Sequence, residues 1–310
     1  MRTSLMACLI AISAYVCLNQ NHNALGNARH AQQTYSVANQ FVYLNTKSTR
    51  PLVEARIGDG RGVEQSGVFE LDTGATHTTL NSSSTQKLGL KSGTTIVTKL
   101  TGRISTATAV LPVLRLGRVE LKNLTVVVLE PMPSPYNVIG IIGADVLMGH
   151  VVTLDFPNER ALFTSQPPTL SEYHVLLEEP IRIRDGLAFV SCRLPGIQQQ
   201  GNCNLLLDTG FNEQVLFCTK MAKFLHLYDT ETMILDTGNG ESTAYFGPLS
   251  WIGIGGKFRI ERAKVGVYDG GPPLPLRAKF CPGILGLAVL QRYVVQIDYG
   301  SRVLRLLQKN

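Results

Sequence analysis

Two aspartates occupy matching places in the chain, each at the end of an apolar run and each followed by Thr-Gly. Asp72 follows residues 68–71, and Asp208 follows residues 204–207. A carboxylate at the end of a buried strand is costly unless it is hydrogen-bonded or shares a proton. If the two meet, they share one proton, so the ionised member can take a proton from water while the protonated member donates to a carbonyl under attack. The pattern predicts a hydrolytic pair that uses no metal and no cofactor.

The residues after each aspartate suit a tight turn around a carboxylate. Thr73 and Thr209 carry hydroxyls that can orient the turn. Gly74 and Gly210 allow close backbone approach, so that amide donors can reach the carboxylate oxygens. We therefore predict that these four residues support the pair of aspartates.

The chain repeats itself, and this repeat predicts its organisation. The aspartates lie 136 positions apart (208 − 72), and residues 141–143 (Ile-Ile-Gly) reappear at 284–286 as Ile-Leu-Gly. Such a repeat indicates two units of one design. We expect an N-terminal unit at residues 41–168 and a C-terminal unit at residues 169–310, each covering its apolar layer by packing on the other.

A third Asp-Thr-Gly begins at Asp236, but its position differs. At the repeat offset Asp236 aligns with Leu100, in the middle of a unit, and Asn239-Gly240 follows it. Asn-Gly is a typical hairpin-turn pair. We interpret Asp236 as a turn residue outside the chemistry.

The elements that must position the aspartates are mostly strands. Short β-branched segments bounded by Gly, Pro or Asn recur along the chain, and only residues 82–88 and 144–148 favour helices. The net charge of +6 comes from scattered Lys and Arg without a basic run, which argues against a nucleic-acid partner. The sequence predicts a mainly β protein.

The N-terminal 26 residues have the pattern of a signal peptide. An apolar run at residues 5–18 follows Arg2 and ends in polar residues, and small residues near Gly26 suit cleavage there. We expect an exported chain, periplasmic or extracellular, with an uncleaved membrane anchor as the alternative. Residues 27–40 are polar and unpatterned, and we interpret them as a flexible lead-in.

Four cysteines lie beyond the targeting segment, and no pair of them has zinc-ligand spacing. Cys192 and Cys203 flank a turn-rich loop at residues 195–201. In a hairpin centred on that loop the two would face each other. A disulfide suits an exported chain, and two free buried thiols are the alternative.

With these motifs the chain resembles the pepsin/retropepsin superfamily of aspartic proteases, and in particular bacterial exported proteins with two tandem retropepsin-like halves. Each half carries an apolar run into Asp-Thr-Gly and later two hydrophobic residues with Gly. Each then runs into Val-Val-x-hydrophobic-Asp-aromatic, at residues 151–156 and 294–299. The resemblance covers residues 40–310.

The resemblance implies a fold of two homologous closed β-barrel-like lobes, related by a pseudo-twofold axis with Asp72 and Asp208 at its centre. It also implies that hairpins in both halves act as flaps over the substrate. The flap candidates are Thr101, Gly102, Thr237 and Gly238. The implied activity is that of a monomeric aspartic endopeptidase, with an extended polypeptide as its partner in the interlobe cleft.

Two departures from the family pattern bear on that activity. Phe211 stands where the family has a small residue and the first half has Ala75, so its ring either crowds the site or points into the core. Asp145 has Ala288 as its counterpart, where the family often uses a charged residue structurally. The alternative function is therefore an inactive peptide-binding or structural module on the same fold. A third option pairs Asp72 with its copy in a second chain.

Overall fold

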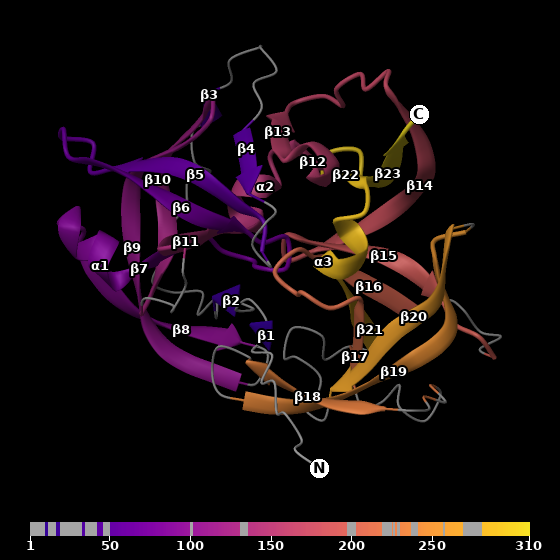
Figure 1. Ribbon diagram of the computed structural model, residues 1–310. Helices are drawn as coiled ribbons and strands as arrows, with labels where there is room; N and C mark the ends of the chain where they lie inside the picture. The colour runs from indigo at the N-terminus through magenta and orange to yellow at the C-terminus, as the bar shows by residue number, and fades with distance from the viewer. Residues whose placement is uncertain are drawn as a thin grey trace.

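The protein is mainly β, as predicted, and its strands form two lobes side by side (Figure 1). The computed structural model describes these residues: 10–11, 17–18, 33–34, 42–45, 50–99, 102–130, 136–196, 203–218, 225, 227, 230–236, 241–256, 258–268 and 281–310.

Six strands of the first lobe pair into a closed ring. In the order of pairing they are β5 (Leu52–Gly58), β6 (Glu64–Leu71), β11 (Val138–Ile142), β7 (Thr79–Asn81), β10 (Val119–Leu129) and β9 (Gly102–Leu116), which returns to β5. The β6–β11 and β7–β10 pairs are parallel and the other four are antiparallel. Because the ring is closed, it has no edge strand.

The second lobe repeats this ring strand for strand. Its members are β15 (Leu187–Arg193), β16 (Cys203–Asp208), β21 (Cys281–Gly286), β17 (Val215–Cys218), β20 (Phe258–Tyr268) and β19 (Glu241–Ile254), which returns to β15. The β16–β21 and β17–β20 pairs are again the parallel ones. The sequence repeat is thus a repeat of topology.

A third sheet joins the lobes. Its strands, in order, are β4 (Val42–Asn45), β13 (Arg160–Thr164), β12 (Val151–Asp155), β22 (Val294–Asp298), β23 (Val303–Lys309) and β14 (Tyr173–Arg184). At its centre β12 and β22 are copies of one another, and Thr153 pairs with Gln296. The Gln296 amide donates to the Thr153 hydroxyl at 3.3 Å.

In the part of the chain that the structure describes, three short α-helices flank the strands. The predicted helices are α1 (Ser82–Lys87) and α2 (Ala144–Leu147), and the third is α3 (Leu287–Leu290). The expectation of only two helices was therefore wrong. Helix α3 is the counterpart of α2 in the repeat, so aligning the two halves would have predicted it. The four apolar residues of α3 alone do not indicate a helix. Asn81 caps α1 by accepting from the Ser84 amide at 2.8 Å, a typical N-cap bond.

A hairpin projects from each lobe. In the first lobe β8 (Ser92–Lys99) pairs with β9, and in the second β18 (Glu231–Asp236) pairs with β19. Two-residue strands border them: β1 (Ile10–Ala11) pairs with β18, and β2 (Cys17–Leu18) with β8 (Figure 1). A third, β3 (Gln33–Thr34), pairs with β10. The rest of residues 1–40, with the predicted signal peptide and lead-in, lies outside the described residues.

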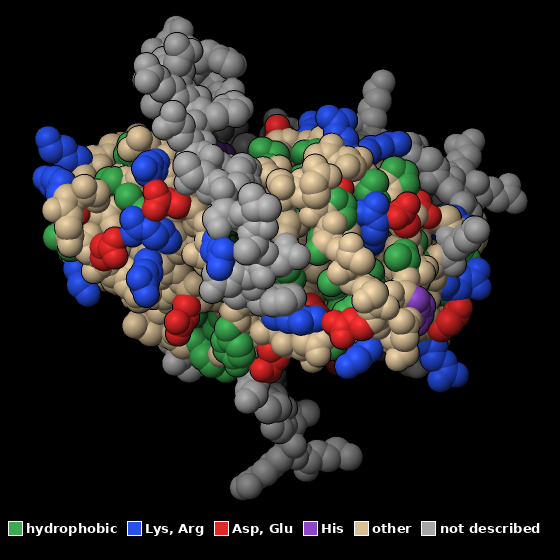
Figure 2. All heavy atoms as spheres, turned by 90° about the horizontal axis from the view of Figure 1, so that it is seen from above, with side chains coloured by type: hydrophobic (Ala, Val, Ile, Leu, Met, Phe, Trp, Pro, Cys, Tyr) green, Lys and Arg blue, Asp and Glu red, His purple; other side chains and the backbone are tan. Residues whose placement is uncertain are grey.

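The surface and the core agree with the composition. On the face drawn in Figure 2, Lys and Arg are interspersed with Asp and Glu without a basic patch. One large apolar cluster includes residues of both rings and of the joining sheet. Within the described part of the chain, no helix combines the length and the apolarity that a membrane span requires.

Candidate active site

Asp72 and Asp208 end equivalent strands, and both are buried. Asp72 directly follows β6 and Asp208 is the last residue of β16; they are 0% and 1% exposed. The Gly74 amide donates to Asp72 Oδ1 at 2.8 Å, and the Gly210 amide donates to Asp208 Oδ1 at 2.9 Å. The Phe211 amide adds a second donor to Asp208 at 3.1 Å. The first turn thus gives Asp72 one amide donor, and the second turn gives Asp208 two.

The structure brings the two carboxyl groups together. The Asp208 carboxyl lies against the turn of Asp72 and interacts with the Asp72 carboxyl. A Cβ placed on Gly74 would lie 2.4 Å from Asp208 Cγ, so only glycine permits this approach. Burial raises the pKa of Asp208 to about 7, against the lowering effect of the Gly210 amide and the interaction with Asp72. The pair therefore has the arrangement in which one proton is shared.

The two threonines hold the lobes to one another at this point. Thr73 Oγ1 donates to the Leu207 carbonyl at 2.7 Å, and Thr209 Oγ1 donates to the Leu71 carbonyl at 2.6 Å. Each threonine amide also donates to the other's hydroxyl, at 3.1 Å in both cases. Sequence reasoning expected the threonines to orient their own turns, whereas each mainly fixes the opposite lobe.

The hydrophobic-hydrophobic-Gly segments pass behind the turns. A Cβ on Gly143 would lie 2.7 Å from the His77 carbonyl, and one on Gly286 would lie 2.5 Å from the Phe211 carbonyl. The following amides bond the turns, Ala144 to the Ala75 carbonyl at 2.8 Å and Leu287 to the Phe211 carbonyl at 2.6 Å. Glycine is needed at both places because backbone packs on backbone.

Phe211 points into the core and does not crowd the pair. It is 0% exposed and packs in an apolar cluster with Leu235, Phe246 and Tyr268 beneath the second hairpin. Its backbone keeps the role of Ala75, because its amide and carbonyl bond the turn and α3. Of the two readings of Phe211, the structure therefore supports the one in the core.

Asp145 supports the first turn through hydrogen bonds. Its carboxylate accepts the Thr78 amide at 2.9 Å and the Thr78 hydroxyl at 2.7 Å. Burial raises the pKa of Asp145, while the Thr78 donors lower it. This residue therefore braces the loop that follows Asp72.

The structure describes one of the four flap candidates. Gly102 is the first residue of β9 and pairs with Lys99, whereas Thr101, Thr237 and Gly238 lie outside the described residues. Asp236 ends β18 and pairs with Glu241 of β19, so this aspartate belongs to the second hairpin.

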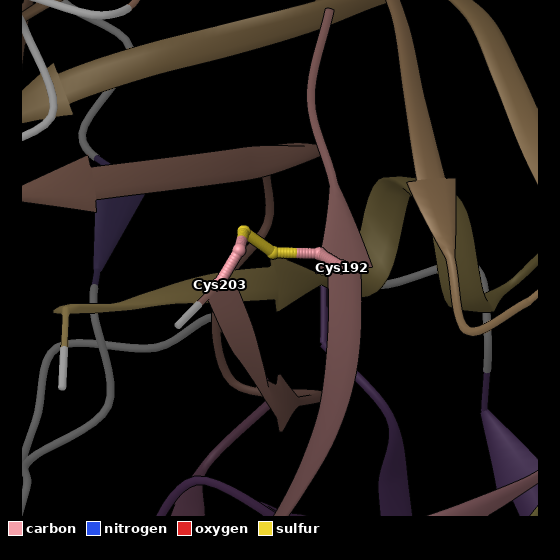
Figure 3. The surroundings of a disulfide bond; sticks show 2 residues. All are labelled: Cys192 and Cys203. Atoms are coloured by element: carbon pink, nitrogen blue, oxygen red, sulfur yellow. A yellow bond between two sulfur atoms is a disulfide. The ribbon is translucent and has the colours of Figure 1, made fainter. Parts of the chain in front are cut away.

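Cys192 and Cys203 form a disulfide, with their Cα atoms 5.0 Å apart. Figure 3 shows the bridge between neighbouring strands β15 and β16. Among the described residues, His, Cys, Asp and Glu form no group of three that could hold a metal ion.

Sequence reasoning missed an ion pair beside the aspartates. Glu70, two residues before Asp72, is buried and accepts from Arg50 at 2.8 Å. The signal was present in the repeat, because the counterpart of Glu70 at the offset of 136 is Leu206.

Comparisons with known proteins agree with this geometry. Residues 53–146 match the family model "Aspartyl protease". The structure is similar to that of an aspartic proteinase from Irpex lacteus, with a TM-score of 0.54 and 16% identity, over 88% of this chain and 98% of that chain. No curated protein matches the sequence. Part of the first lobe is therefore similar in sequence to aspartyl proteases, the chain has a two-lobed, pepsin-like fold, and the predicted resemblance to aspartic proteases is confirmed.

Proposed function

We propose that the chain is an aspartic endopeptidase in which Asp72 and Asp208 activate a water for attack on a peptide bond. The observation that carries this proposal is the meeting of two buried carboxyls, one from each lobe, with Gly74 of the first turn packed directly on the Asp208 carboxyl. Burying two acids together is costly unless they share a proton, and that shared-proton state is the one that general acid–base hydrolysis uses.

The two acids act as a pair that shares one proton. The ionised member accepts a proton from the water as the water oxygen bonds to the peptide carbon. The protonated member donates its proton to the carbonyl oxygen, which gives a neutral tetrahedral species. As the C–N bond breaks, the acid that took the proton from the water gives it to the leaving nitrogen. The other acid takes a proton from a hydroxyl of the tetrahedral species, so the product is a carboxylic acid and the pair holds one proton again.

We further propose that a pseudo-twofold axis relates the two lobes. The substrate would be an extended polypeptide held between them, beneath the hairpins β8–β9 and β18–β19. Strand edges bind extended chains through main-chain hydrogen bonds. We also propose that the chain is exported and acts as a monomer. The apolar run at residues 5–18 and the Cys192–Cys203 disulfide both support export.

The test is cleavage of an unfolded protein by the purified chain between acidic and neutral pH. Asp72→Asn and Asp208→Asn should each abolish cleavage, since either leaves one half of the acid–base pair. The matched control is Asp185→Asn, at an exposed turn where φ is 51°, a conformation that Asn tolerates. It should cleave like the parent chain.

Two outcomes would contradict the proposal. Equal cleavage by either dyad variant would remove the aspartates from the chemistry. Binding of the unfolded protein without any cleavage by the parent chain would favour a peptide-binding module instead.

A further inference from the structure

Lys264 joins the loop that follows Asp208 to the second hairpin. Its ammonium lies 3.3 Å from a carboxylate oxygen of Glu213 and 2.7 Å from a carboxylate oxygen of Glu231. Glu213 belongs to the loop between β16 and β17, and Glu231 is the first residue of β18. One cation on β20 therefore connects the loop beside the aspartate with the hairpin.

An apolar contact joins the same two segments. Phe211 of the loop shares a buried cluster with Leu235 of β18 and Phe246 of β19. The ammonium of Lys264 lies over the ring of Phe246, 5.3 Å from its centroid, so the ionic and the apolar contacts adjoin each other. The Lys264 amide also donates to the side-chain oxygen of Gln214 at 2.9 Å. The loop and the hairpin are therefore joined by packing as well as by charge.

The first lobe has other residue types at the equivalent places. Leu80 and Leu216 are equivalent in the repeat, and the strands that pair outward from them match position by position. The equivalent pairs, each with its first-lobe residue named first, are Ala75 and Phe211, His77 and Glu213, Thr94 and Glu231, Ala107 and Phe246, and Val126 and Lys264. Val126 and Thr94 carry no charge, so they cannot form the ionic link, and alanines stand where the second lobe has two rings. This link between loop and hairpin is therefore specific to the second lobe.

The first loop is braced from a helix instead. Thr78 bonds to Asp145 of α2, and the equivalents of these two residues in the repeat are Gln214 and Ala288. Ala288 has no polar group in its side chain, and Gln214 bonds to the amide of Lys264 on β20. Through side chains, the first loop is thus fixed to its helix, and the second loop is fixed to the strands that carry its hairpin.

We propose that Lys264 is a positioning residue that couples closure of the β18–β19 hairpin over the substrate to the placement of Asp208. The proposal rests on the proposed peptidase function and deepens it, because it gives the two hairpins unequal parts. A hairpin that shifts as it closes moves Glu231 and the apolar cluster, and packed side chains and ion pairs of this kind carry a shift from one segment to the next. The residue types of the first lobe cannot transmit a shift of the β8–β9 hairpin in this way.

The first test separates kcat from KM in the cleavage of unfolded protein. Lys264→Met removes the charge and keeps the aliphatic stem over Phe246. Because misplacing Asp208 weakens the acid–base step and leaves substrate binding largely unchanged, kcat should fall while KM changes little. The lost contacts are partly exposed ion pairs, so we expect a fall of about two- to fivefold. Lys264→Arg retains the charge and should keep most of the parent's kcat.

Glu231→Gln distinguishes coupling from local support of the loop. The Glu231 side chain is 60% exposed and lies on the hairpin, so a Lys264 that merely braced the loop would not need it. With coupling, Glu231→Gln should lower kcat by a similar factor, and the double variant with Lys264→Met should fall no further, because both variants break the same link. The matched control is Lys122→Met on β10, the strand equivalent to β20, where the lysine pairs with Glu120 at 3.4 Å. It should cleave like the parent chain.

A second measurement does not depend on cleavage. Hydrogen exchange, read by mass spectrometry of peptides, reports the opening of backbone amides in β18 and in the loop of residues 211–214. In Glu231→Gln, exchange should become faster in both segments and stay unchanged in β8, and Lys122→Met should alter none of the three. Faster exchange in β18 alone, with an unchanged loop and an unchanged kcat, would overturn the coupling while the peptidase stands. If the parent chain cleaves nothing, the proposed function fails, and the exchange still tests the link between hairpin and loop.

Discussion

Thr73 and Thr209 exchange four hydrogen bonds across the boundary between the lobes. Each hydroxyl donates to a carbonyl of the opposite lobe, at 2.7 and 2.6 Å, and each accepts the other's amide at 3.1 Å. Both residues are 0% exposed. This exchange sets the separation of the turns, and with it the meeting of Asp72 and Asp208.

Removing either hydroxyl should weaken both the fold and the site. Thr73→Val or Thr209→Val keeps the shape but leaves a buried carbonyl and a buried amide without their partner. Each should lower the free energy of unfolding by about 1–3 kcal/mol, which urea denaturation measures. Cleavage should fall as the aspartates shift. Thr→Ser at the same positions retains the hydroxyl and should lose much less, so an equal loss in the Ser variants would contradict this account.

Asp208 should make stability fall as pH rises. Its folded pKa of about 7 lies above its ordinary value of 3.8, so the protonated acid favours the folded chain. The contribution is complete below about pH 4 and is lost as the pH rises through about 7, with a size on the order of a few kcal/mol. Asp208→Asn carries no such titration, so it should be more stable than the parent chain at pH 8.

Urea denaturation of both proteins at pH 4 and pH 8 checks this prediction. The difference between the two chains cancels the titrating groups that do not interact with Asp208, so it reports the titration of the Asp72–Asp208 pair. A parent chain whose stability relative to Asp208→Asn is the same at both pH values would show that the Asp208 pKa is not raised.

Phe211→Ala should destabilise the chain although it restores the small residue of the first turn. The ring fills a cluster with Leu235, Phe246 and Tyr268, and its loss leaves a cavity beneath the second hairpin. A cost of about 3–5 kcal/mol is expected from thermal or urea unfolding. Phe211→Leu retains part of the packing and should cost clearly less. A gain in stability for Phe211→Ala would place the ring outside the core.

The Cys192–Cys203 bridge should stabilise the second lobe. Its cysteines are 11 positions apart, and closing a loop of that size is worth about 3 kcal/mol in the chain-entropy account. The double variant Cys192→Ala with Cys203→Ala should lose about that much in urea denaturation. In the denatured parent chain, reductant should release two additional thiols, and in the double variant none. Equal thiol counts with and without reductant in the parent chain would show that the bridge is not formed.

The sequence alone determined the repeat, the mainly β class and the two aspartates. These are local or periodic properties: Asp-Thr-Gly after an apolar run, short β-branched segments, and the same motifs twice in one order. The repeat also separated Asp72 and Asp208 from Asp236, because only the first two have matching surroundings. The third helix escaped because four apolar residues have no distinctive periodicity.

Contacts between the lobes were decided only by the tertiary structure. Thr73 binds a carbonyl 134 positions away, and no local rule specifies that partner. The direction of Phe211 depends on a cluster built from distant strands, and its residue type suited both readings. The sequence does not show that Glu70 has an ion-pair partner, because Arg50 reaches it only in the folded chain. A sequence states which groups are present, while their protonation and partners depend on distances that packing alone sets.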